Sequence, residues 1–349
     1  MLIIFIFVLM MLTNINCLSS EKFYKKNLLN KNYNIISLQP EFSNDVNITS
    51  NLTPKTILYY QHYNNDNYID NFIKNNSIDS IISENDFVTC QKNTLTQKYF
   101  NKTNIDLNKC HYLNDKKSLR DYLSKFDNIN KVQNIMINND GSLERSIKEV
   151  KFNNFIIKPI KGAGSGGIFN LYYKNDKLIG LDKFLNEYKD NIYLNLTNKF
   201  IVEEFIGGTE HNLDIVMYKG KIYFWHISDD LIDMIYFQDI GTRFPSKLNK
   251  KDSLEMYQQT INILDHLNIK NGVYHFEFKF YNNKAYLIEL NPRRPGGNYV
   301  DYIDKLYGSN LNYDEILISL GKEPFYNMKY IENKPKKKVY VKKSIMHIY

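Results

Sequence analysis

An acid and an amide stand two residues apart at the end of an apolar run, in the stretch IELNPRRPGGN (288–298). A second run upstream, VYHFEFKFY, carries Glu277 between aromatic residues. Successive side chains of a strand point to opposite faces, so the aromatic residues predict an apolar face and Glu277 lies on the other one. Glu289 and Asn291 share one face of the later run in the same way. Both strands are therefore predicted to present oxygen atoms on one chemical face.

The two runs predict an antiparallel hairpin whose register follows from its apolar positions. In the second strand, the positions expected to face the core are Tyr286, Ile288 and Leu290. If both apolar sets face one core, the residue numbers of each cross-strand pair add up to an even number. This requires an odd-length loop around 282–284 instead of a two-residue turn. The simplest register then pairs Glu277 directly with Glu289.

This pairing indicates a metal site. Two carboxylates placed opposite each other repel in an ordinary sheet, so a cation is expected between Glu277 and Glu289. Together with the Asn291 oxygen they form an all-oxygen set that suits Mg²⁺ (or Mn²⁺), with phosphates and water as the remaining ligands. The alternative is that both glutamates are ordinary exposed charges.

The stretch KGAGSGG offers a cradle for those phosphates. Its glycines let backbone N–H groups converge on an anion without Cβ obstruction, a serine adds a hydroxyl and the lysine before it a charge. The predicted cradle consists of Lys158, Gly162, Gly164, Ser165, Gly166 and Gly167. It is not a P-loop, and because a second strand follows it, it does not open a helix as a dinucleotide motif would. A flexible hairpin turn is the alternative.

The elements that must position these residues fall into three units. From Asn34, short apolar runs alternate with helical stretches, which predicts a small parallel α/β unit that includes helices at 95–100 and 116–126. A second unit begins at Phe152, and a third contains a helix from Ser253 to Leu267, opened by the capping-box spacing of 252–255. The predicted divisions are an apolar N-terminal segment (1–20), an N-terminal α/β domain (21–126), a central subdomain (127–200), a C-terminal subdomain (201–325) and a basic tail (326–349).

Composition allows a full core and excludes some classes of protein. The 349 residues are 43% hydrophobic, and three cysteines form no metal or disulfide pattern. The formal net charge of +7 is partly gathered in the basic tail, which is expected to be solvated, so nucleic-acid binding is not predicted. The segment from Met1 to Leu12 is too short to span a bilayer, and Met1–Ser19 resembles a signal peptide or anchor, with a buried first strand as the alternative.

Five motifs together resemble the ATP-grasp superfamily, and within it the carboxylate–amine ligases that include the L-amino-acid (dipeptide-forming) ligases. They are NDKKSLRDYL, FIIKPIKGAGSGGI, IVEEFIGGTEH, GVYHFEFK and YLIELNPRRPGG, and the resemblance runs from about Asn34 to about Pro324. It implies a mixed α+β and α/β fold, in which a small parallel α/β domain precedes two α+β subdomains that sandwich ATP. This branch often ends with a further small subdomain, whereas little follows Pro324 here.

The resemblance also implies roles for individual residues. Lys116, with Lys117 as the alternative, and Lys158 match the two lysines that contact ATP. Arg293, and alternatively Arg294, match the arginine that steadies the acyl-phosphate. Residues that match the adenine hinge, the ribose contact and the Mg²⁺ ligands are Glu203, Glu204, Phe205, Ile206, Glu210, Glu277, Glu289 and Asn291. Arg243 and Lys247 lie in a loop that is either a substrate clamp or ordinary surface.

The implied activity is an ATP-dependent ligation of a carboxylate to an amine, with amino acids as the expected substrates and an acyl-phosphate as intermediate. Such chemistry needs positioning and charge neutralisation more than a protein nucleophile. The alternatives are an ATP-binding protein without turnover and a carboxylase of the same fold. The expected cofactors are ATP and Mg²⁺ (or Mn²⁺), and a homodimer is one assembly that the sequence allows. ATP use favours the cytoplasm, although the apolar N-terminal segment is unexpected there.

Overall fold

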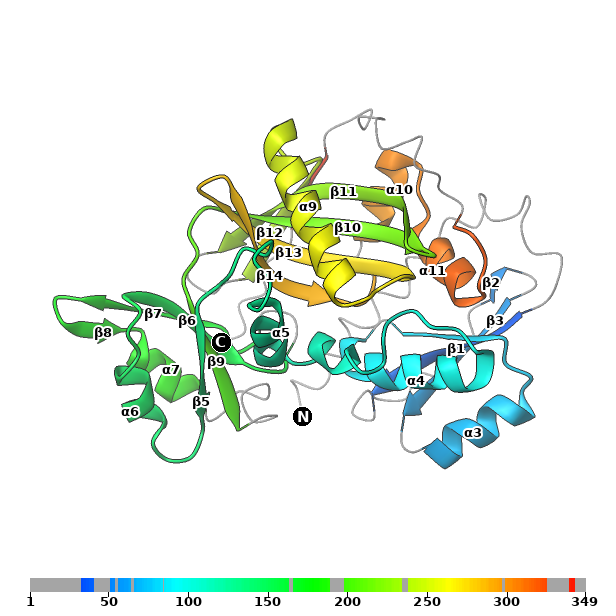
Figure 1. Ribbon diagram of the computed structural model, residues 1–349, viewed down its shortest axis with the longest axis horizontal. Coiled ribbons are helices and arrows are strands. Elements are labelled where there is room, and N and C mark those ends of the chain that lie inside the picture. The colour runs from blue at the N-terminus through cyan, green and yellow to red at the C-terminus, as the bar shows by residue number, and fades with distance from the viewer. Residues whose placement is uncertain are drawn as a thin grey trace.

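The computed structural model places three β-sheets around a central helix (Figure 1). It describes residues 33–40, 51–53, 56–63, 66–83, 85–162, 166–188, 198–233, 238–296, 299–324 and 339–342. The predicted signal-like segment Met1–Ser19 lies outside these residues. Within the described ranges, no helix has both the length and the apolar character needed to cross a bilayer.

The N-terminal domain is a small parallel α/β unit, as predicted. Its sheet has the order β2-β3-β1-β4, and β1 runs parallel to both β3 and β4. Buried isoleucines such as Ile36, Ile69 and Ile81 join the sheet to its helices. The elements are β1 (Tyr33–Pro40), β2 (Asn51–Thr53), β3 (Thr56–Tyr63), α3 (Asp66–Asn75), β4 (Ser80–Ile82), the short 3₁₀ helix η2 (Asp86–Val88) and α4 (Thr89–Phe100).

Two short helices lead from this domain to the centre of the molecule. η3 (Cys110–Leu113) is followed by α5 (Lys116–Leu123), whose N-cap Asp115 accepts a hydrogen bond from the Ser118 backbone N–H at 2.8 Å. α5 lies between the three sheets (Figure 1). Its apolar face, with Leu119 and Leu123, packs into the largest core cluster. The helix predicted for 116–126 is thus confirmed, and it ends slightly earlier.

The central subdomain is an antiparallel sheet in the order β5-β9-β6-β7-β8. Phe155, Phe184 and Phe200 are fully buried beneath its two helices and form a core of their own. Its last strand ends at Glu204, a few residues beyond the predicted boundary at 200. The elements are β5 (Asn134–Asn138), α6 (Leu143–Lys148), β6 (Asn154–Pro159), β7 (Phe169–Lys174), β8 (Lys177–Ile179), α7 (Leu181–Glu187) and β9 (Lys199–Glu204).

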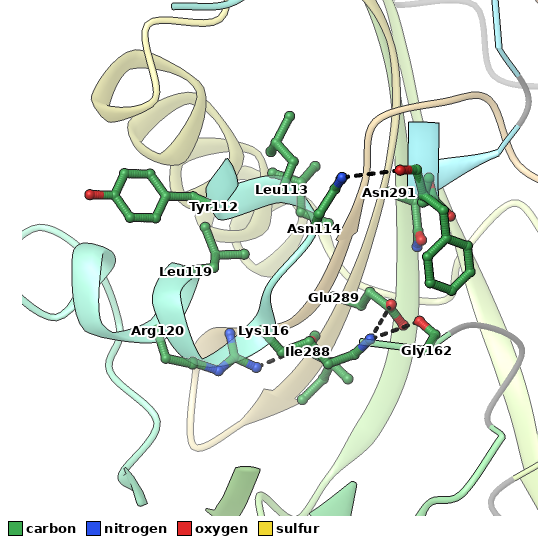
Figure 2. Close-up of a pocket in the computed structure, with 13 residues that line it drawn as sticks. Tyr112, Leu113, Asn114, Lys116, Leu119, Arg120, Gly162, Ile288, Glu289 and Asn291 are labelled. Atoms are coloured by element: carbon green, nitrogen blue, oxygen red, sulfur yellow. Dashed lines mark hydrogen bonds and ion pairs between the residues drawn. The ribbon is translucent and has the colours of Figure 1, made fainter. Parts of the chain in front are cut away.

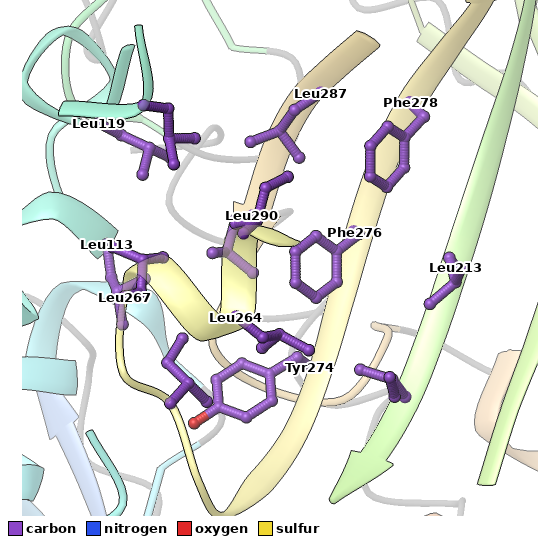
Figure 3. Packing of buried hydrophobic residues seen from close by; sticks show 14 of the residues in the cluster. Leu113, Leu119, Leu213, Leu264, Leu267, Tyr274, Phe276, Phe278, Leu287 and Leu290 are labelled. Carbon is purple, nitrogen blue, oxygen red and sulfur yellow. The ribbon is translucent and has the colours of Figure 1, made fainter. Parts of the chain in front are cut away.

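The C-terminal subdomain is built on a larger sheet, in the order β14-β13-β10-β11-β12-β15. Helix α9 packs on one face over Phe276, Phe278 and Leu290 (Figure 3), and α10 and α11 pack against the apolar part of the opposite face. The edge strand β15 comes from the predicted basic tail, so the tail contributes to the sheet. The elements are β10 (Thr209–Tyr218), β11 (Lys221–Asp233), β12 (Gln238–Phe244), α9 (Lys250–His266), β13 (Gly272–Tyr281), β14 (Lys284–Asn291), α10 (Tyr299–Tyr307), α11 (Leu311–Ser319) and β15 (Val339–Lys342).

The β13–β14 hairpin confirms the predicted pairing of Glu277 with Glu289 but not the predicted turn. Tyr281 pairs with Lys284, so the turn has two residues, and both have the positive φ that a type I′ turn requires (Asn282 +49°, Asn283 +59°). A β-bulge then shifts the register between Phe278 and Glu277. The prediction of an odd-length loop was wrong because the extra residue lies within the strand instead of in the loop. There it has the same effect on which residues pair across the hairpin.

The bulge also corrects the predicted apolar positions of β14. Before it, Ala285 and Leu287 face the core; after it, Leu290 does. Tyr286 and Ile288 are only half-buried, in contrast to the prediction. The extra residue is Ile288, because Glu277 pairs with Glu289 and the next residue, Phe278, pairs with Leu287. Without this bulge, Glu289 would lie on the core face.

The start of α9 differs from the predicted capping box. The helix begins at Lys250, and its N-cap is Asn249, whose side chain accepts from the Asp252 backbone N–H at 3.0 Å. Asp252 is therefore inside the first turn, where a carboxylate also favours the helix dipole. Asn249 accepts a hydrogen bond from the first turn of the helix, whose backbone N–H groups have no partner within the helix, and so takes the place of the predicted capping box.

The link between β9 and β10 generates a stability prediction. A Cβ on Gly208, whose φ is +82°, would lie 2.0 Å from the Phe280 carbonyl oxygen, whereas one on Gly207 would touch only the flexible ring of Tyr281 at 3.3 Å. We expect Gly208→Ala to lower the free energy of unfolding in urea by roughly 3 kcal/mol or more, because strain and a backbone clash add. Gly207→Ala is the matched control, and an equal loss in both variants would contradict this.

Candidate active site

Two facing carboxylates form the centre of the candidate site. Glu277 on β13 and Glu289 on β14 are directly paired, and Lys116 at the start of α5 reaches them, with its Nζ 2.9 Å from Glu289 Oε1 (Figure 2). Asn291 lies beside them, and its Nδ2 donates to Glu277 Oε1 at 3.2 Å. The structure therefore brings the three predicted metal ligands together. Lys117 instead pairs with Asp121 along the helix, so Lys116 is the lysine at this site.

Cationic side chains balance the charge of the two glutamates. Burial by itself would raise the pKa of Glu277, but His275, Arg293 and Lys116 hold it below its usual value. Burial likewise opposes the charged form of Lys116, and the Glu289 carboxylate raises the pKa of the lysine above its usual value. Glu277 is thus kept ionised, and the two paired carboxylates together with the Asn291 oxygen fit a hard divalent cation such as Mg²⁺.

Behind Glu277 lies a buried histidine–aspartate pair. His275 Nδ1 is 2.8 Å from Asp214 Oδ1, and its Nε2 is 3.6 Å from Glu277 Oε1. His226 approaches the second Asp214 oxygen at 2.9 Å. Burial disfavours the charged imidazole, yet Asp214 and Glu277 raise the pKa of His275 to about 10. His275 therefore contributes a positive charge beside Glu277.

A second charged network joins all the parts of the site. Glu203 at the end of β9 is fully buried between Arg120 of α5, at 2.5 Å, and Lys158 of β6, at 2.7 Å. Burial would raise the pKa of Glu203, but Arg120 and Lys158 hold it at about 2. Arg120 also donates from Nη2 to the carbonyl of Ile288, the bulge residue of β14, at 3.0 Å. One guanidinium thus connects α5, the central sheet and the strand that carries Glu289.

The predicted phosphate cradle lies next to both lysines. Lys116, Lys158, Gly162, Gly166 and Glu289 line one small pocket, and Lys116 Nζ also donates to the Gly162 carbonyl at 3.0 Å. A Cβ on Gly162 would come within 3.2 Å of the Pro159 side chain, so this position favours glycine. Gly167 has a positive φ of +77°. Gly164 and Ser165 lie outside the described residues, and their role stays a prediction.

The predicted adenine hinge follows directly after Glu203. Glu204 accepts from the Gln133 backbone N–H at 2.9 Å, and the Phe205 backbone N–H donates to the Asn154 carbonyl. Glu210 on β10 pairs with Lys279 at 3.0 Å, and burial raises the pKa of its carboxyl despite that lysine. Ile206, which ends the hinge, is half-buried. Contacts of these residues with adenine or ribose stay predictions.

The structure separates the two candidate arginines. Arg293 donates from Nε to Asp86 Oδ2 at 3.0 Å and from Nη2 to Asn291 Oδ1 at 3.3 Å, which places it beside the metal ligands. Arg294 Nε lies 3.3 Å from Glu315 of α11. Arg293 is therefore the arginine at the site.

The possible substrate clamp at 243–247 is occupied by the protein itself. Arg243 pairs with Asp229 on the neighbouring strand, and the Lys247 backbone N–H donates to the same carboxylate at 3.0 Å. Asp229 also contacts His211 at 2.6 Å. These residues form a structural cluster. Residues paired directly across strands point to the same face of a sheet, and Arg243 pairs with Asp229, Asp229 with His211, and His211 with the core residue Phe278. Arg243 therefore points to the α9 face of the sheet.

Sequence reasoning did not single out three charged residues of this site: Arg120, Asp214 and Asp86. Arg120 carried a signal, since it follows Lys116 by one helical turn and so shares its face. Asp214 also carried a signal, because it is an acidic residue within an otherwise apolar strand. Asp86 carried none, because it comes from another domain and reaches Arg293 only in three dimensions.

Comparison with known proteins agrees with this geometry. Residues 151–301 match the family model of the ATP-grasp domain. The chain contains an ATP-grasp domain. Human carnosine synthase 1 is 28% identical to it over 128 residues, which span 36% of this chain but only 16% of that protein.

Solved structures show the same fold over most of the chain. An L-amino acid ligase from Bacillus licheniformis superposes with a TM-score of 0.68 and 14% identity, covering 90% of this chain and 80% of that one. A biotin carboxylase domain from Hydrogenobacter thermophilus, in complex with magnesium ADP, ADP and bicarbonate, gives 0.62 and 14% over 87% of this chain and 68% of that one. The ATP-grasp fold is thus confirmed, and ATP with Mg²⁺ agrees with the groups bound in that neighbour.

The buried Arg120 network generates a prediction with an internal control. Removing one partner of a buried ion pair leaves the other charges uncompensated, so Arg120→Met should lower the free energy of unfolding by about 3–5 kcal/mol. Arg145 forms an exposed pair with Glu149 at 3.0 Å, and Arg145→Met should change it by less than about 1 kcal/mol. Urea unfolding measures both, and similar losses would contradict the role of Arg120.

The two neighbouring lysines of α5 allow a matched test of nucleotide binding. Lys116→Met removes a charge at the cradle, so we expect the affinity for a magnesium-bound, non-hydrolysable ATP analogue to fall roughly 10- to 100-fold. Lys117→Met removes only a helix-surface pair with Asp121 and should change it by less than about twofold. Calorimetric titration measures both affinities, and equal effects would exclude the assignment of Lys116.

Proposed function

We propose that this protein is an ATP- and Mg²⁺-dependent ligase that joins a carboxylate to an amine through an acyl-phosphate, with amino acids as its substrates. The observation that carries the proposal is the convergence of Lys116, Lys158, Glu289 and the glycine-rich turn around one pocket, with Arg293 beside it. The lysines, the arginine and the backbone N–H groups of the turn stabilise negative charge on oxygen atoms, and none of these groups is an activated nucleophile.

The proposed reaction has two balanced steps. A carboxylate oxygen of the first substrate attacks the γ-phosphorus of ATP, the bond to the β–γ bridging oxygen breaks, and ADP leaves. The amine nitrogen then attacks the acyl carbon, inorganic phosphate leaves, and the nitrogen loses a proton. Lys116, Lys158 and Arg293 stabilise the negative charge that gathers on phosphate and carbonyl oxygens during both steps. When bound, Mg²⁺ adds further charge neutralisation, and Glu277, Glu289 and Asn291 would hold it.

Several observations support a ligase over an ATP-binding protein without turnover. A binder needs only the cradle, whereas this chain also keeps paired carboxylates and a buried charge network that orients the strand of Glu289. The similarity to carnosine synthase 1 and to an L-amino acid ligase points to amino acids as substrates. The aligned part is a small fraction of carnosine synthase 1, so this similarity supports the class of substrate and not its identity.

The direct test is ADP release with a panel of amino-acid pairs. We expect release that needs a carboxylate and an amine together, in equal amounts with the amide product. Arg293→Met should lower this rate by roughly 100-fold or more, since a charge-stabilising group is lost. Arg294→Met is the matched control and should retain most of the activity, because Arg294 faces Glu315.

Two outcomes would contradict the ligase. ATP binding without ADP release across the whole panel would favour a regulatory protein. ADP release that depends on bicarbonate instead of an amine would favour a carboxylase.

A further inference from the structure

Two residues that line the pocket beside the metal ligands each carry a buried acceptor atom. Asp86 Oδ1 and Asn114 Oδ1 are both shielded from solvent and accept no hydrogen bond from the part of the chain that the structure describes. Both residues line the larger pocket. Figure 2 shows Asn114 in this pocket together with Lys116, Glu289 and Asn291. A buried acceptor without a donor costs about 1–3 kcal/mol, so such atoms call for a ligand that supplies N–H groups.

The surrounding contacts hold each acceptor in place. Asp86 Oδ2 is bound by Arg293 Nε at 3.0 Å, which leaves Oδ1 as the second oxygen of an oriented carboxylate. The Asn114 side chain donates from Nδ2 to the Phe87 carbonyl at 3.5 Å, so its nitrogen faces the backbone and its oxygen the other way. Two oxygens from different segments are thus fixed as acceptors at one pocket.

The position of Asp86 in the fold is that of a ligand-binding residue. It follows β4 closely in sequence, at the carboxyl end of the parallel N-terminal sheet. Ligands of open α/β sheets bind outside the carboxyl ends of the strands. Through Arg293, the same residue is connected to Asn291 and hence to the metal site. A substrate in this pocket would have one end at the reacting phosphate and the other at the N-terminal domain.

The lining of the pocket suits a small acid. It contains about 520 Å³ of empty space, part of it open to solvent, and Phe87, Tyr112 and Leu113 provide apolar walls. Lys116 lines the pocket and Arg293 lies next to it, bound to Asp86, so both cations are near enough to attract the carboxylate of the acid. Asp86 and Asn114 each add one acceptor oxygen that has no donor in the described chain.

We propose that Asp86 and Asn114 bind the ammonium group of the acid that is activated, so that the enzyme selects an acid with a free amino group. The inference rests on the proposed ligase function and adds the substrate group that is recognised. An ammonium group fits because it has three donors and a positive charge, which complement a carboxylate and an amide oxygen. N-acylated and des-amino acids lack that charge, so they leave Asp86 Oδ1 without a cationic partner.

The test is a binding measurement that does not depend on turnover. In the presence of magnesium ADP, saturation-transfer NMR compares each standard amino acid and β-alanine with its N-acetyl derivative and its des-amino acid. We expect at least one free amino acid to bind roughly tenfold or more tightly than both of its derivatives, which corresponds to one charge-assisted hydrogen bond. Equal binding of either derivative, or binding of no amino acid in the panel, would overturn the inference.

Variants separate recognition of the ammonium group from general structural damage. In Asp86→Asn, the amide oxygen would face Arg293 and the amide nitrogen would face the pocket. The preference for the free amino acid should therefore be lost. The affinity for the des-amino acid should stay within about twofold of the wild-type value. Asn114→Leu should act in the same direction, and Asn114→Asp, which keeps the acceptor, should retain the preference. If both loss variants weaken the amino acid and the des-amino acid equally, Asp86 acts only through Arg293 and the inference fails.

The same experiment distinguishes this inference from the ligase proposal. ADP release with des-amino or N-acetyl acids as efficient as with amino acids would leave the ligase intact and remove the ammonium site. Selective binding of free amino acids without ADP release would support the ammonium site and contradict the ligase.

Discussion

The direct opposition of Glu277 and Glu289 is the constraint on which the rest of the site depends. Two carboxylates at adjacent positions of a sheet repel, and burial adds a cost for each charge. The fold meets this cost with Lys116, His275 and Arg293, each from a different element, and Asp214 in turn supports the charge of His275. In the proposed function, a metal ion and phosphates replace part of these contacts when the nucleotide binds.

Arg120 and Asp86 extend this electrostatic arrangement to the whole molecule. Arg120 connects the hinge residue Glu203 with the bulge carbonyl of Ile288, so the central sheet and the strand of Glu289 share one buried guanidinium. Asp86 connects the N-terminal domain to Arg293. The predicted nucleotide cradle, the predicted metal ligands and the proposed substrate pocket therefore lie on three units that are joined by charged as well as apolar contacts across their boundaries.

Much of this arrangement could be predicted from the sequence, because the residues involved obey local rules. Strand parity placed Glu277, Glu289 and Asn291 on one face, and the motif resemblance identified Lys116, Lys158 and the ATP-grasp fold. The turn was predicted incorrectly because parity alone cannot distinguish an odd loop from a two-residue turn followed by a bulge. The bulge residue Ile288 accepts a hydrogen bond from Arg120, a contact between residues distant in sequence that strand parity cannot reveal. Asp86 and Asn114 were not identified for the same reason, since their shared pocket exists only after the domains pack.

The most direct test of the central claim is an experimental structure with magnesium and a non-hydrolysable ATP analogue. The account predicts a metal ion between Glu277 and Glu289, with the Asn291 oxygen nearby and Lys116 moved from Glu289 to a phosphate oxygen. A nucleotide bound with its metal away from these two carboxylates, while Lys116 still pairs with Glu289, would contradict it.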